Sequence, residues 1–322
     1  MPDKFADKKT RVSKNGKTRT IIAYSVIAVF AIGLGAGGAW AYNQFFSKKA
    51  SSNIVVDGTT LADDIDAVMK KYDGVKNRSS LHTELTPYEM IDVAMHKFST
   101  SPYYFEVGKG STSAAIADQV IYASFVKNDK AYFEESISTG LINLYDRMYM
   151  EGNSTDCYWG GSSNYAGMKK KSYDNEEYKS LMGRNISTPS SYVVSKKTCL
   201  FKSSPSGRGV TSSSKTSDGY EVEIELNPGD DKGVSGYRLQ MKTVSSLAAL
   251  PSFYYCHLSF KLDFDLNFVE STVYESYWAQ QSEMIGAKMV ATIRSKYFTY
   301  SSAEEAQKIP DLNTTIDYSK YF

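Results

Sequence analysis

The chain has 322 residues, of which 42% are apolar, 13% aromatic and 23% charged, with only 8 Pro. This composition excludes a disordered chain, a collagen-like repeat and a membrane protein with many spans. The net charge of +1 hides an asymmetry, because residues 1–19 carry seven Lys or Arg against two Asp, and residues 20–42 carry no charge. The rest of the chain is therefore net acidic, and its length suits one large domain or at most two.

Residues 20–42 (TIIAYSVIAVFAIGLGAGGAWAY) form one apolar run that follows the basic arm at residues 1–19. As a helix, at about 1.5 Å per residue, this run spans about 35 Å, enough to cross a hydrocarbon core of about 30 Å. A helix also satisfies its own backbone within lipid. Because Lys and Arg favour the cytoplasmic side, we expect a single-pass signal-anchor helix with a cytoplasmic N-terminus and an extracytoplasmic C-terminal part.

Two interpretations of the end of this segment stay open. Its length favours an uncleaved anchor, since the apolar region of a signal peptide has only about 7–15 residues. Ala39-Trp40-Ala41 nevertheless has the small-x-small form of a cleavage site, which would release the protein after Ala41. Gly33 and Gly37 form a G-x-x-x-G pair, a spacing that lets two membrane helices approach closely and makes these glycines a candidate helix-pairing site.

We expect residues 43–58 to form a short stalk and residues 59–322 to form the extracytoplasmic domain. Leu61, Ile65, Val68 and Tyr72 recur at helical spacing, which predicts a helix over residues 60–72. Thr86-Pro87-Tyr88-Glu89 is a capping box with proline at the first helical position, and it predicts a second helix over residues 87–99.

After Pro102 the apolar period changes from 3.6 to 2, which is typical of strands. Four runs follow with connections too short for crossover helices, so they predict an antiparallel meander with a turn at Asn128-Asp129. These runs are residues 103–107, 119–126, 130–138 and 142–150.

The second half of the chain predicts a mixture of helix, loop and further strands. Residues 159–175 have no clear period, whereas the segments after them predict a short helix at 175–182 ending at Gly183, a strand at 191–201 and an exposed loop at 202–218. Further strands are predicted at 220–226, 237–242, 253–262, 268–278 and 288–300, and a brief final helix is predicted over 302–310. In the first of these strands Glu221, Glu223 and Glu225 alternate with apolar residues, which predicts one wet side.

Enzyme motifs are sparse. The chain has three histidines, His82, His96 and His257. Neither HExxH nor GxSxG occurs, so the motifs typical of zinc hydrolases and serine hydrolases are missing from the sequence. His257 alternates within a predicted strand and is expected to have a hydrogen-bonded structural role. Adjacent Glu134 and Glu135 point to opposite faces of a strand, which weighs against a cooperating carboxylate pair. We therefore predict a non-enzymatic protein with no catalytic, cofactor-binding or metal-binding residues.

Two further features have modest interpretations. Asp263, Asp265 and Asn267 imitate the start of a calcium loop, but Phe268 stands where such loops need glycine, so a hairpin turn is favoured. Three cysteines allow at most one intramolecular bridge, for which Cys157 and Cys199 are our candidates, with three free thiols as the alternative.

The order of these elements resembles the LolA/LppX-like envelope proteins. The resemblance rests on the capped helix from Thr86 to Phe98, the meander around residues 133–138 and the late strands joined by Asp263-Phe264-Asp265. The tally of about ten strands with helices mostly before them predicts an α+β fold with a large antiparallel sheet. The resemblance implies that this sheet is curved and that the N-terminal helices pack on one face. It also implies the carriage of lipids or lipoproteins. Here one transmembrane helix precedes the domain, in place of a free or lipidated N-terminus.

The function expected from these features is binding. Strands 119–126 and 253–262 are apolar on both faces, and the chain has 25 Tyr and 15 Phe, which suits a surface for a lipid or another amphiphile. The alternative is a non-enzymatic envelope scaffold or signalling protein that acts through protein–protein contacts. The expected partners are the membrane, a lipid or amphiphile and envelope proteins. Nucleic acid is excluded because the exported part is net acidic.

Overall fold

The computed structural model describes residues 64–114, 117–140, 144–151, 154–161, 170–187, 192–229, 232–245, 247–280, 282, 286–310 and 316–322. The chain divides into two compact units, residues 1–48 and residues 49–322, and every described residue belongs to the second. The basic arm, the apolar segment and the stalk lie outside the described residues and stay predictions. Within the described ranges, no helix has the length and apolar character needed to cross a bilayer.

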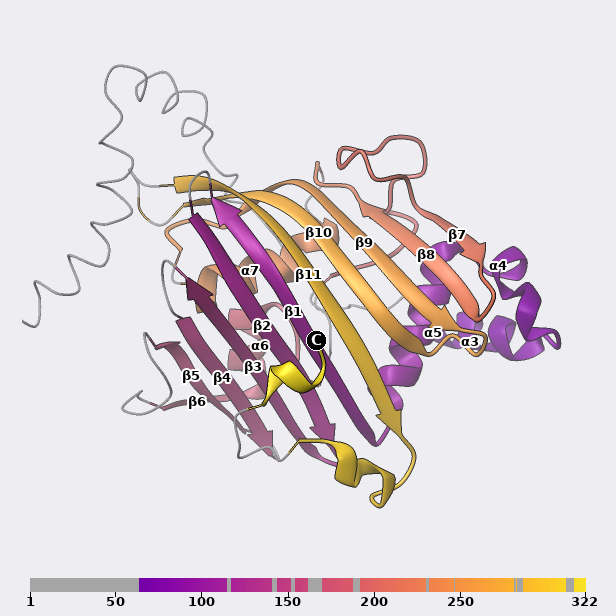
Figure 1. Ribbon diagram of the computed structural model, residues 1–322, viewed down its shortest axis with the longest axis horizontal. Coiled ribbons are helices and arrows are strands. Elements are labelled where there is room, and N and C mark those ends of the chain that lie inside the picture. Colours follow the sequence, from indigo (N-terminus) through magenta and orange to yellow (C-terminus); the bar gives the residue numbers. More distant parts are fainter. Residues whose placement is uncertain are drawn as a thin grey trace, which may run out of the picture. The chain divides into compact units, whose positions relative to one another are not determined.

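Eleven strands among the described residues form one antiparallel sheet: β1 (Tyr103–Ala114), β2 (Ala117–Asn128), β3 (Ala131–Gly140), β4 (Leu144–Glu151), β5 (Ser154–Gly161), β6 (Lys171–Asp174), β7 (Ser212–Lys215), β8 (Gly219–Leu226), β9 (Ser252–Asp263), β10 (Phe268–Gln280) and β11 (Gly286–Tyr300). Their order is β6-β5-β4-β3-β2-β1-β11-β10-β9-β8-β7 (Figure 1), so the sheet is open and its edges are two short strands. Two meanders, β1 to β6 and β7 to β11, join where β1 pairs with β11.

Most predicted strands are confirmed. The meander predicted over residues 103–150 corresponds to β1–β4, and four of the later strands correspond to β8–β11. The turn between β2 and β3 is Asp129-Lys130, one residue later than predicted, and Asp129 adopts a φ of 54°. Strands β5, β6 and β7 were not predicted, because their short serine- and glycine-containing sequences lack a clear apolar alternation.

Three helices precede the sheet: α3 (Ile65–Gly74), α4 (Leu81–Glu84) and α5 (Pro87–Thr100). α5 begins with the predicted capping box, in which the backbone N–H of Thr86 donates to Glu89 Oε2 at 2.7 Å and the backbone N–H of Glu89 donates to Thr86 Oγ1 at 3.4 Å. Both bonds satisfy N–H groups that lack a partner within the helix. α3 has Asp64 as its N-cap, so it begins later than the predicted residue 60.

Two helices occur within the strand sequence. α6 (Asn175–Met182) was predicted and ends at Gly183, whose φ of 69° is the left-handed conformation that glycine adopts without strain. α7 (Ser235–Val244) corrects the strand predicted at 237–242. Tyr237, Met241 and Val244 are spaced for one helical face and pack against the core, and a short apolar run fits both periods. The predicted final helix is a 3₁₀ turn at Glu305–Lys308.

The prediction of a strand at 191–201 is also wrong, since residues 192–200 are irregular, with a turn at residues 196–198. The Thr198 hydroxyl donates to the carbonyl of Val193 at 2.8 Å, and such local side-chain bonds compete with strand pairing. Cys199 alone forms an isolated bridge, to Leu226 at the end of β8.

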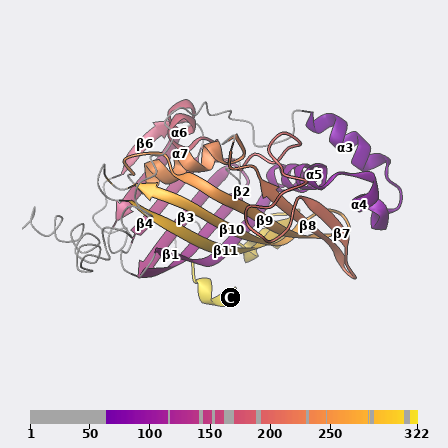
Figure 2. The same ribbon diagram turned by 90° about the horizontal axis from the view of Figure 1, so that it is seen from above.

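The helices lie on one face of the sheet, which we call the inner face, and the chain's last residues lie on the other, the outer face (Figure 2). On the inner face α5 packs on β8 and β10, while α6 packs on β5 and β6. The larger hydrophobic core forms between these helices and the alternate sheet residues that face them. α5 and α6 thus pack towards the two ends of the sheet, and α7 (Ser235–Val244) lies between them, with Gln240 bonded to Glu134 of β3 and Tyr237 bonded to Glu275 of β10.

The centre of the outer face is covered by residues 316–322, which we call the C-terminal segment. Beneath it Phe105, Val107 and Phe133 are at most 2% exposed, and the ring of Tyr321 lies 5.1 Å from that of Phe105. The Tyr318 hydroxyl donates to Oε1 of the fully buried Glu135 at 3.0 Å. Apolar packing and this buried hydrogen bond together hold the segment on the sheet.

Replacing Tyr318 by Phe removes this hydroxyl and keeps the ring. We expect Tyr318→Phe to lower the free energy of unfolding by roughly 1–3 kcal/mol, because the buried Glu135 carboxyl loses a hydrogen-bond donor. Denaturation followed by circular dichroism measures the change. Ser319→Ala removes a hydroxyl that bonds the exposed Asp317 and serves as the matched control, with an expected change within about 0.5 kcal/mol. Equally small losses of unfolding free energy in both variants would contradict a stabilising hydrogen bond between Tyr318 and Glu135.

Candidate functional site

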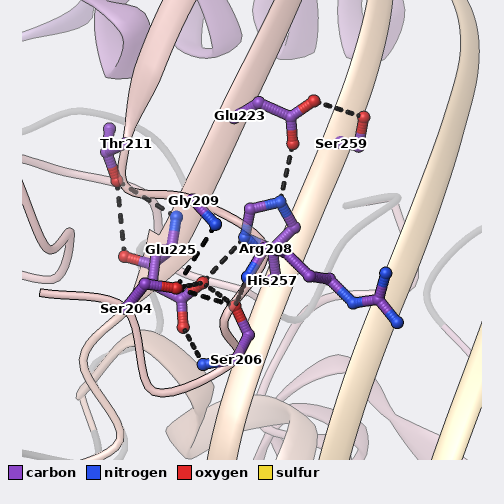
Figure 3. Close-up of polar contacts among 9 residues, drawn as sticks. All are labelled: Ser204, Ser206, Arg208, Gly209, Thr211, Glu223, Glu225, His257 and Ser259. Carbon is purple, nitrogen blue, oxygen red and sulfur yellow. Dashed lines mark hydrogen bonds and ion pairs between the residues drawn. The ribbon is translucent and has the colours of Figure 1, made fainter.

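Two polar arrangements stand out on the sheet, one on each face. The first, on the outer face, centres on His257 of β9 and two glutamates of β8, and a loop lies over it (Figure 3). We call it the His257 cluster, and its residues are Ser204, Ser206, Thr211, Glu223, Glu225, His257 and Ser259.

His257 lies between two carboxylates. Its Nδ1 is 2.7 Å from Glu225 Oε2 and its Nε2 is 2.6 Å from Glu223 Oε2, and the ring is only 2% exposed. Burial of the ring opposes protonation, but the two hydrogen bonds and the charges of the glutamates outweigh it and raise the pKa of His257 to about 9. The ring is therefore an imidazolium at neutral pH and donates from both nitrogens.

Glu225 also binds the overlying loop. Ser206 Oγ donates to Glu225 Oε2 at 2.5 Å, and the backbone N–H of Glu225 donates to Thr211 Oγ1 at 3.1 Å. Arg208 extends across the sheet, and its guanidinium carbon lies 3.6 Å from the ring centroid of Tyr274 on β10. The cluster thus joins the loop between residues 204 and 211 to three neighbouring strands.

This geometry fits fastening better than nucleophilic catalysis. A serine nucleophile needs a hydrogen bond to a histidine nitrogen that can accept its proton. Both nitrogens of His257 are engaged by carboxylates, and Ser206 donates to Glu225 instead. The hydrogen bonds predicted for His257 are present, and its structural role stays a prediction. Glu225, predicted to lie on a wet side, is fully buried because the loop covers it.

The second arrangement is a row across the inner face, which we call the inner row: Tyr297 on β11, Glu106 on β1, Phe125 on β2 and Glu134 on β3. Glu106 is paired in register with Tyr297 and Phe125, and Phe125 is paired in turn with Glu134. Directly opposed residues on neighbouring strands have Cβ atoms about 4.5–5.5 Å apart. The row therefore alternates aromatic rings and carboxyl groups within contact distance.

Glu134 has a cation of the chain as its partner. Arg184, which follows α6 and is almost fully buried, forms an ion pair with Glu134, and Gln240 of α7 donates to Glu134 Oε1 at 3.2 Å. The Arg184 guanidinium carbon also lies 5.8 Å from the ring centroid of Phe125. Burial opposes the charge of Arg184, but the adjacent Glu134 raises its pKa, so Arg184 stays charged.

Two other inner-face carboxyls are held by hydroxyl groups. Glu275 on β10 is 1% exposed and accepts from Tyr192 at 3.2 Å and from Tyr237 at 3.1 Å. Burial raises the pKa of Glu275 to about 7 despite these two hydrogen bonds. Burial likewise raises the pKa of Glu106 to about 7, against hydrogen bonds from Ser295 and Tyr297. Glu106 keeps partial solvent exposure, so it is strongly desolvated and still accessible.

The inner face beside the row is apolar and partly open. Gly110 of β1 is paired with Ile121 of β2 and with Ile293 of β11, and all three retain intermediate exposure, as does Ala123. A Cβ atom at Gly110 would lie 2.2 Å from the carbonyl oxygen of Thr292, so glycine is needed for the close approach of β1 and β11. The centre of the inner face thus presents small and branched apolar residues to solvent.

The predicted site residues have different outcomes. Gly33 and Gly37 lie outside the described residues, so helix pairing stays a prediction. Glu134 and Glu135 point to opposite faces as predicted, since one contacts Arg184 and the other contacts Tyr318. Asp263 forms the predicted hairpin turn, accepting from the backbone of Asn267 at 2.8 Å. Among the described residues, no group of three or more His, Cys, Asp or Glu could hold a metal ion.

The proposed bridge between Cys157 and Cys199 is absent, because all three cysteines are free, buried thiols. Cys157 lies on β5 and Cys199 lies beside β8, and seven strands separate β5 from β8 in the sheet. The eight spacings from β5 to β8, at about 4.8 Å each, add up to roughly 38 Å along the sheet, whereas a disulfide needs Cα atoms about 4.4–6.8 Å apart. Sequence spacing gave no sign of this separation.

No family model matches the chain, and no curated protein matches its sequence. Among solved structures it is similar to lipoprotein LppX of Mycobacterium tuberculosis, with 5% identity and a TM-score of 0.31 over 66% of this chain and 93% of that one. It is also similar to a DUF1329 family protein of Desulfovibrio piger, with 11% identity and a TM-score of 0.24 over 67% and 92% of the two chains.

A third similar structure is a LolA superfamily protein of Nitrosomonas europaea, with 9% identity and a TM-score of 0.23 over 69% of this chain and 96% of that one. The structures similar to this chain thus include LppX and a LolA superfamily protein, in line with the resemblance stated from the sequence. Likeness at these TM-scores carries no weight for function, which has to come from the residues of the chain itself.

The charged His257 makes stability depend on pH. Its folded pKa of about 9 exceeds the ordinary 6.5, so its contribution is complete below pH 6.5 and is lost as the pH rises through 9. Burial of Glu223 opposes its charge, but bonds from His257 and Ser259 lower its pKa, so its contribution is lost in acid below its ordinary 4.5. We expect His257→Gln to cost roughly 2–3 kcal/mol at pH 6 and much less at pH 10.

Denaturation of both proteins at pH 6, 8 and 10, followed by circular dichroism, measures this difference. His96→Gln, which makes the same substitution at a helix position outside the cluster, is the matched control. A cost of His257→Gln that stays constant up to pH 10 would show that the ring is not held as a cation.

The cysteines offer a direct chemical test of the missing bridge. Burial raises the pKa of Cys157 to about 12 and that of Cys199 to about 11, so both thiols should react slowly with iodoacetamide in the folded protein at pH 8. After denaturation without reductant, mass spectrometry should count three alkylated cysteines. A single alkylated cysteine would restore the predicted bridge.

Proposed function

We propose that this protein is a membrane-anchored extracytoplasmic binding module that takes an amphiphile on the inner face of its sheet. The observation that carries the proposal is the contrast between the two faces at the centre of the sheet. On the outer face the C-terminal segment seals Phe105, Val107 and Phe133. On the inner face Ile121 of β2 and Ile293 of β11, the two neighbours of β1, stay partly exposed.

The chemistry of the inner face changes along the strands in the way that an amphiphile requires. Around Gly110 the surface is apolar, formed by Ile121 and Ile293 with Val273 of β10 beyond them. Four residues earlier on β1 the inner row supplies carboxyl groups and the Tyr297 hydroxyl. Four residues of strand span about 13 Å, which is close to the length of an extended acyl chain of medium length. A polar head at the row would place its chain over the apolar surface.

The position of the module outside the cytoplasm is supported by the sequence. Residues 20–42 are apolar over a bilayer-spanning length, and residues 1–19 are strongly basic. A module anchored beside the bilayer would exchange amphiphiles with it over a short distance.

The proposal can be tested by photocrosslinking. The full chain, in micelles of an uncharged glycoside detergent, is irradiated with a photoreactive dodecyl probe that has an uncharged glycol head, and labelled peptides are mapped by mass spectrometry. We expect labelling of β1, β2 and β11, together with labelling of residues 20–42 as an internal reference. Ala123→Trp should reduce the labelling of the three strands at least about threefold, because the indole fills inner-face surface beside Gly108.

Val120→Trp is the matched control, since Val120 lies on the outer face of the same strand and is 38% exposed. It should leave the labelling unchanged. Labelling confined to residues 20–42 in the unmodified protein would contradict the proposal, and so would an equal loss in the two variants.

A further inference from the structure

The inner row holds two carboxyl groups in matched surroundings. Phe125 stands between Glu106 on one side and Glu134 on the other, in register with both. Tyr297 flanks Glu106 on its other side. Each carboxyl is therefore beside an aromatic ring, an arrangement that favours a cation, because a ring face and a carboxylate both attract positive charge.

At Glu134 the chain supplies this cation itself. The Arg184 guanidinium forms an ion pair with the carboxylate and lies 5.8 Å from the Phe125 ring centroid. The contact is almost fully buried. In this structure, therefore, the carboxyl of Glu134 and the ring of Phe125 together contact a cation.

At Glu106 the corresponding place is taken by hydroxyl groups only. Ser295 and Tyr297 donate to the carboxyl, and no ion pair joins Glu106 to a cation within the described part of the chain. Glu106 is also partly exposed, whereas Arg184 is 3% exposed. Glu106 thus shares the neighbour Phe125 with Glu134, has Tyr297 where Glu134 has Met148, and keeps access from solvent.

We infer that Glu106, between Tyr297 and Phe125, recognises the cationic head of an amphiphile, a quaternary ammonium or protonated amine. The inference rests on the proposed function and names the class of ligand. The head occupies at Glu106 the place that Arg184 occupies at Glu134. The chain of the amphiphile then lies over the apolar surface around Gly110.

Recognition of this kind depends on pH. Glu106 must be ionised to hold the cation, and its pKa of about 7 makes the ionised fraction rise about tenfold between pH 6 and pH 8. The charged groups that act on it are Glu134, which raises its pKa, and Arg184, which lowers it. Burial raises the pKa values of Tyr104 and Tyr297, so both phenols stay neutral in this range.

The test compares three photoreactive dodecyl probes that differ only in their heads: trimethylammonium, uncharged glycol and sulfate. The full chain is labelled in the same uncharged micelles, and the labelling of β1, β2 and β11 is divided by that of residues 20–42. The trimethylammonium charge does not titrate, so any pH dependence belongs to the protein. We expect this probe to label the strands about tenfold more than the sulfate probe at pH 8, and about tenfold less at pH 6 than at pH 8.

Glu106→Gln should lower labelling by the trimethylammonium probe about tenfold at pH 8, to the level of the glycol probe, and should abolish its pH dependence. Labelling by the glycol probe should stay within about twofold. Glu221→Gln makes the same change in charge at an exposed outer-face residue of β8 and should leave all three probes unaffected.

The outcomes separate this inference from the proposed function. Equal labelling of the three strands by all heads would overturn the recognition of a cation and leave amphiphile binding intact. A preference that survives Glu106→Gln would also overturn it. Labelling by every probe confined to residues 20–42 would overturn both.

Discussion

Successive side chains of a strand point to opposite faces, so a sheet of eleven strands must cover two surfaces at once. In this chain different segments cover the two faces. On the inner face α5 and α6 pack towards the two ends, and α7 is bonded to β3 and β10, whereas the C-terminal segment lies over part of the outer face. Between these helix contacts Ile121 and Ile293 of the inner face remain partly exposed. The candidate site follows from this unequal covering.

The two polar arrangements differ in what they leave available. In the His257 cluster each nitrogen and the carboxylate of Glu225 has its partner within the chain, so the charges are used to hold a loop. In the inner row Arg184 forms an ion pair with Glu134. Glu106 instead accepts hydrogen bonds from hydroxyl groups and keeps contact with solvent. A buried charge that is already paired serves the fold, and a desolvated carboxyl without a cation is the better candidate for a ligand.

Features set by near neighbours in the sequence were predictable. The capping box at Thr86 and the alternation in β8–β11 each depend on residues within one element, and the structure confirms them. Failures came from contacts between distant segments. Tyr237 lies on a helix because that helix packs on the inner face, and Glu225 is buried because the loop covers it. The inner row joins residues from β11, β1, β2 and β3, and no sequence spacing reveals that register.

The row also lies across the junction of the two meanders. Tyr297 belongs to the last strand and Glu106 to the first, and these strands pair from Tyr103 with Tyr300 to Ala114 with Met289. Closing so long a loop costs entropy before the contacts repay it, so this junction is expected to be a late step of folding. Neither half-sheet alone would contain the complete recognition surface. A chain that has not finished folding would therefore be unable to bind the proposed amphiphile. The bound amphiphile would in turn stabilise the pairing of β1 with β11.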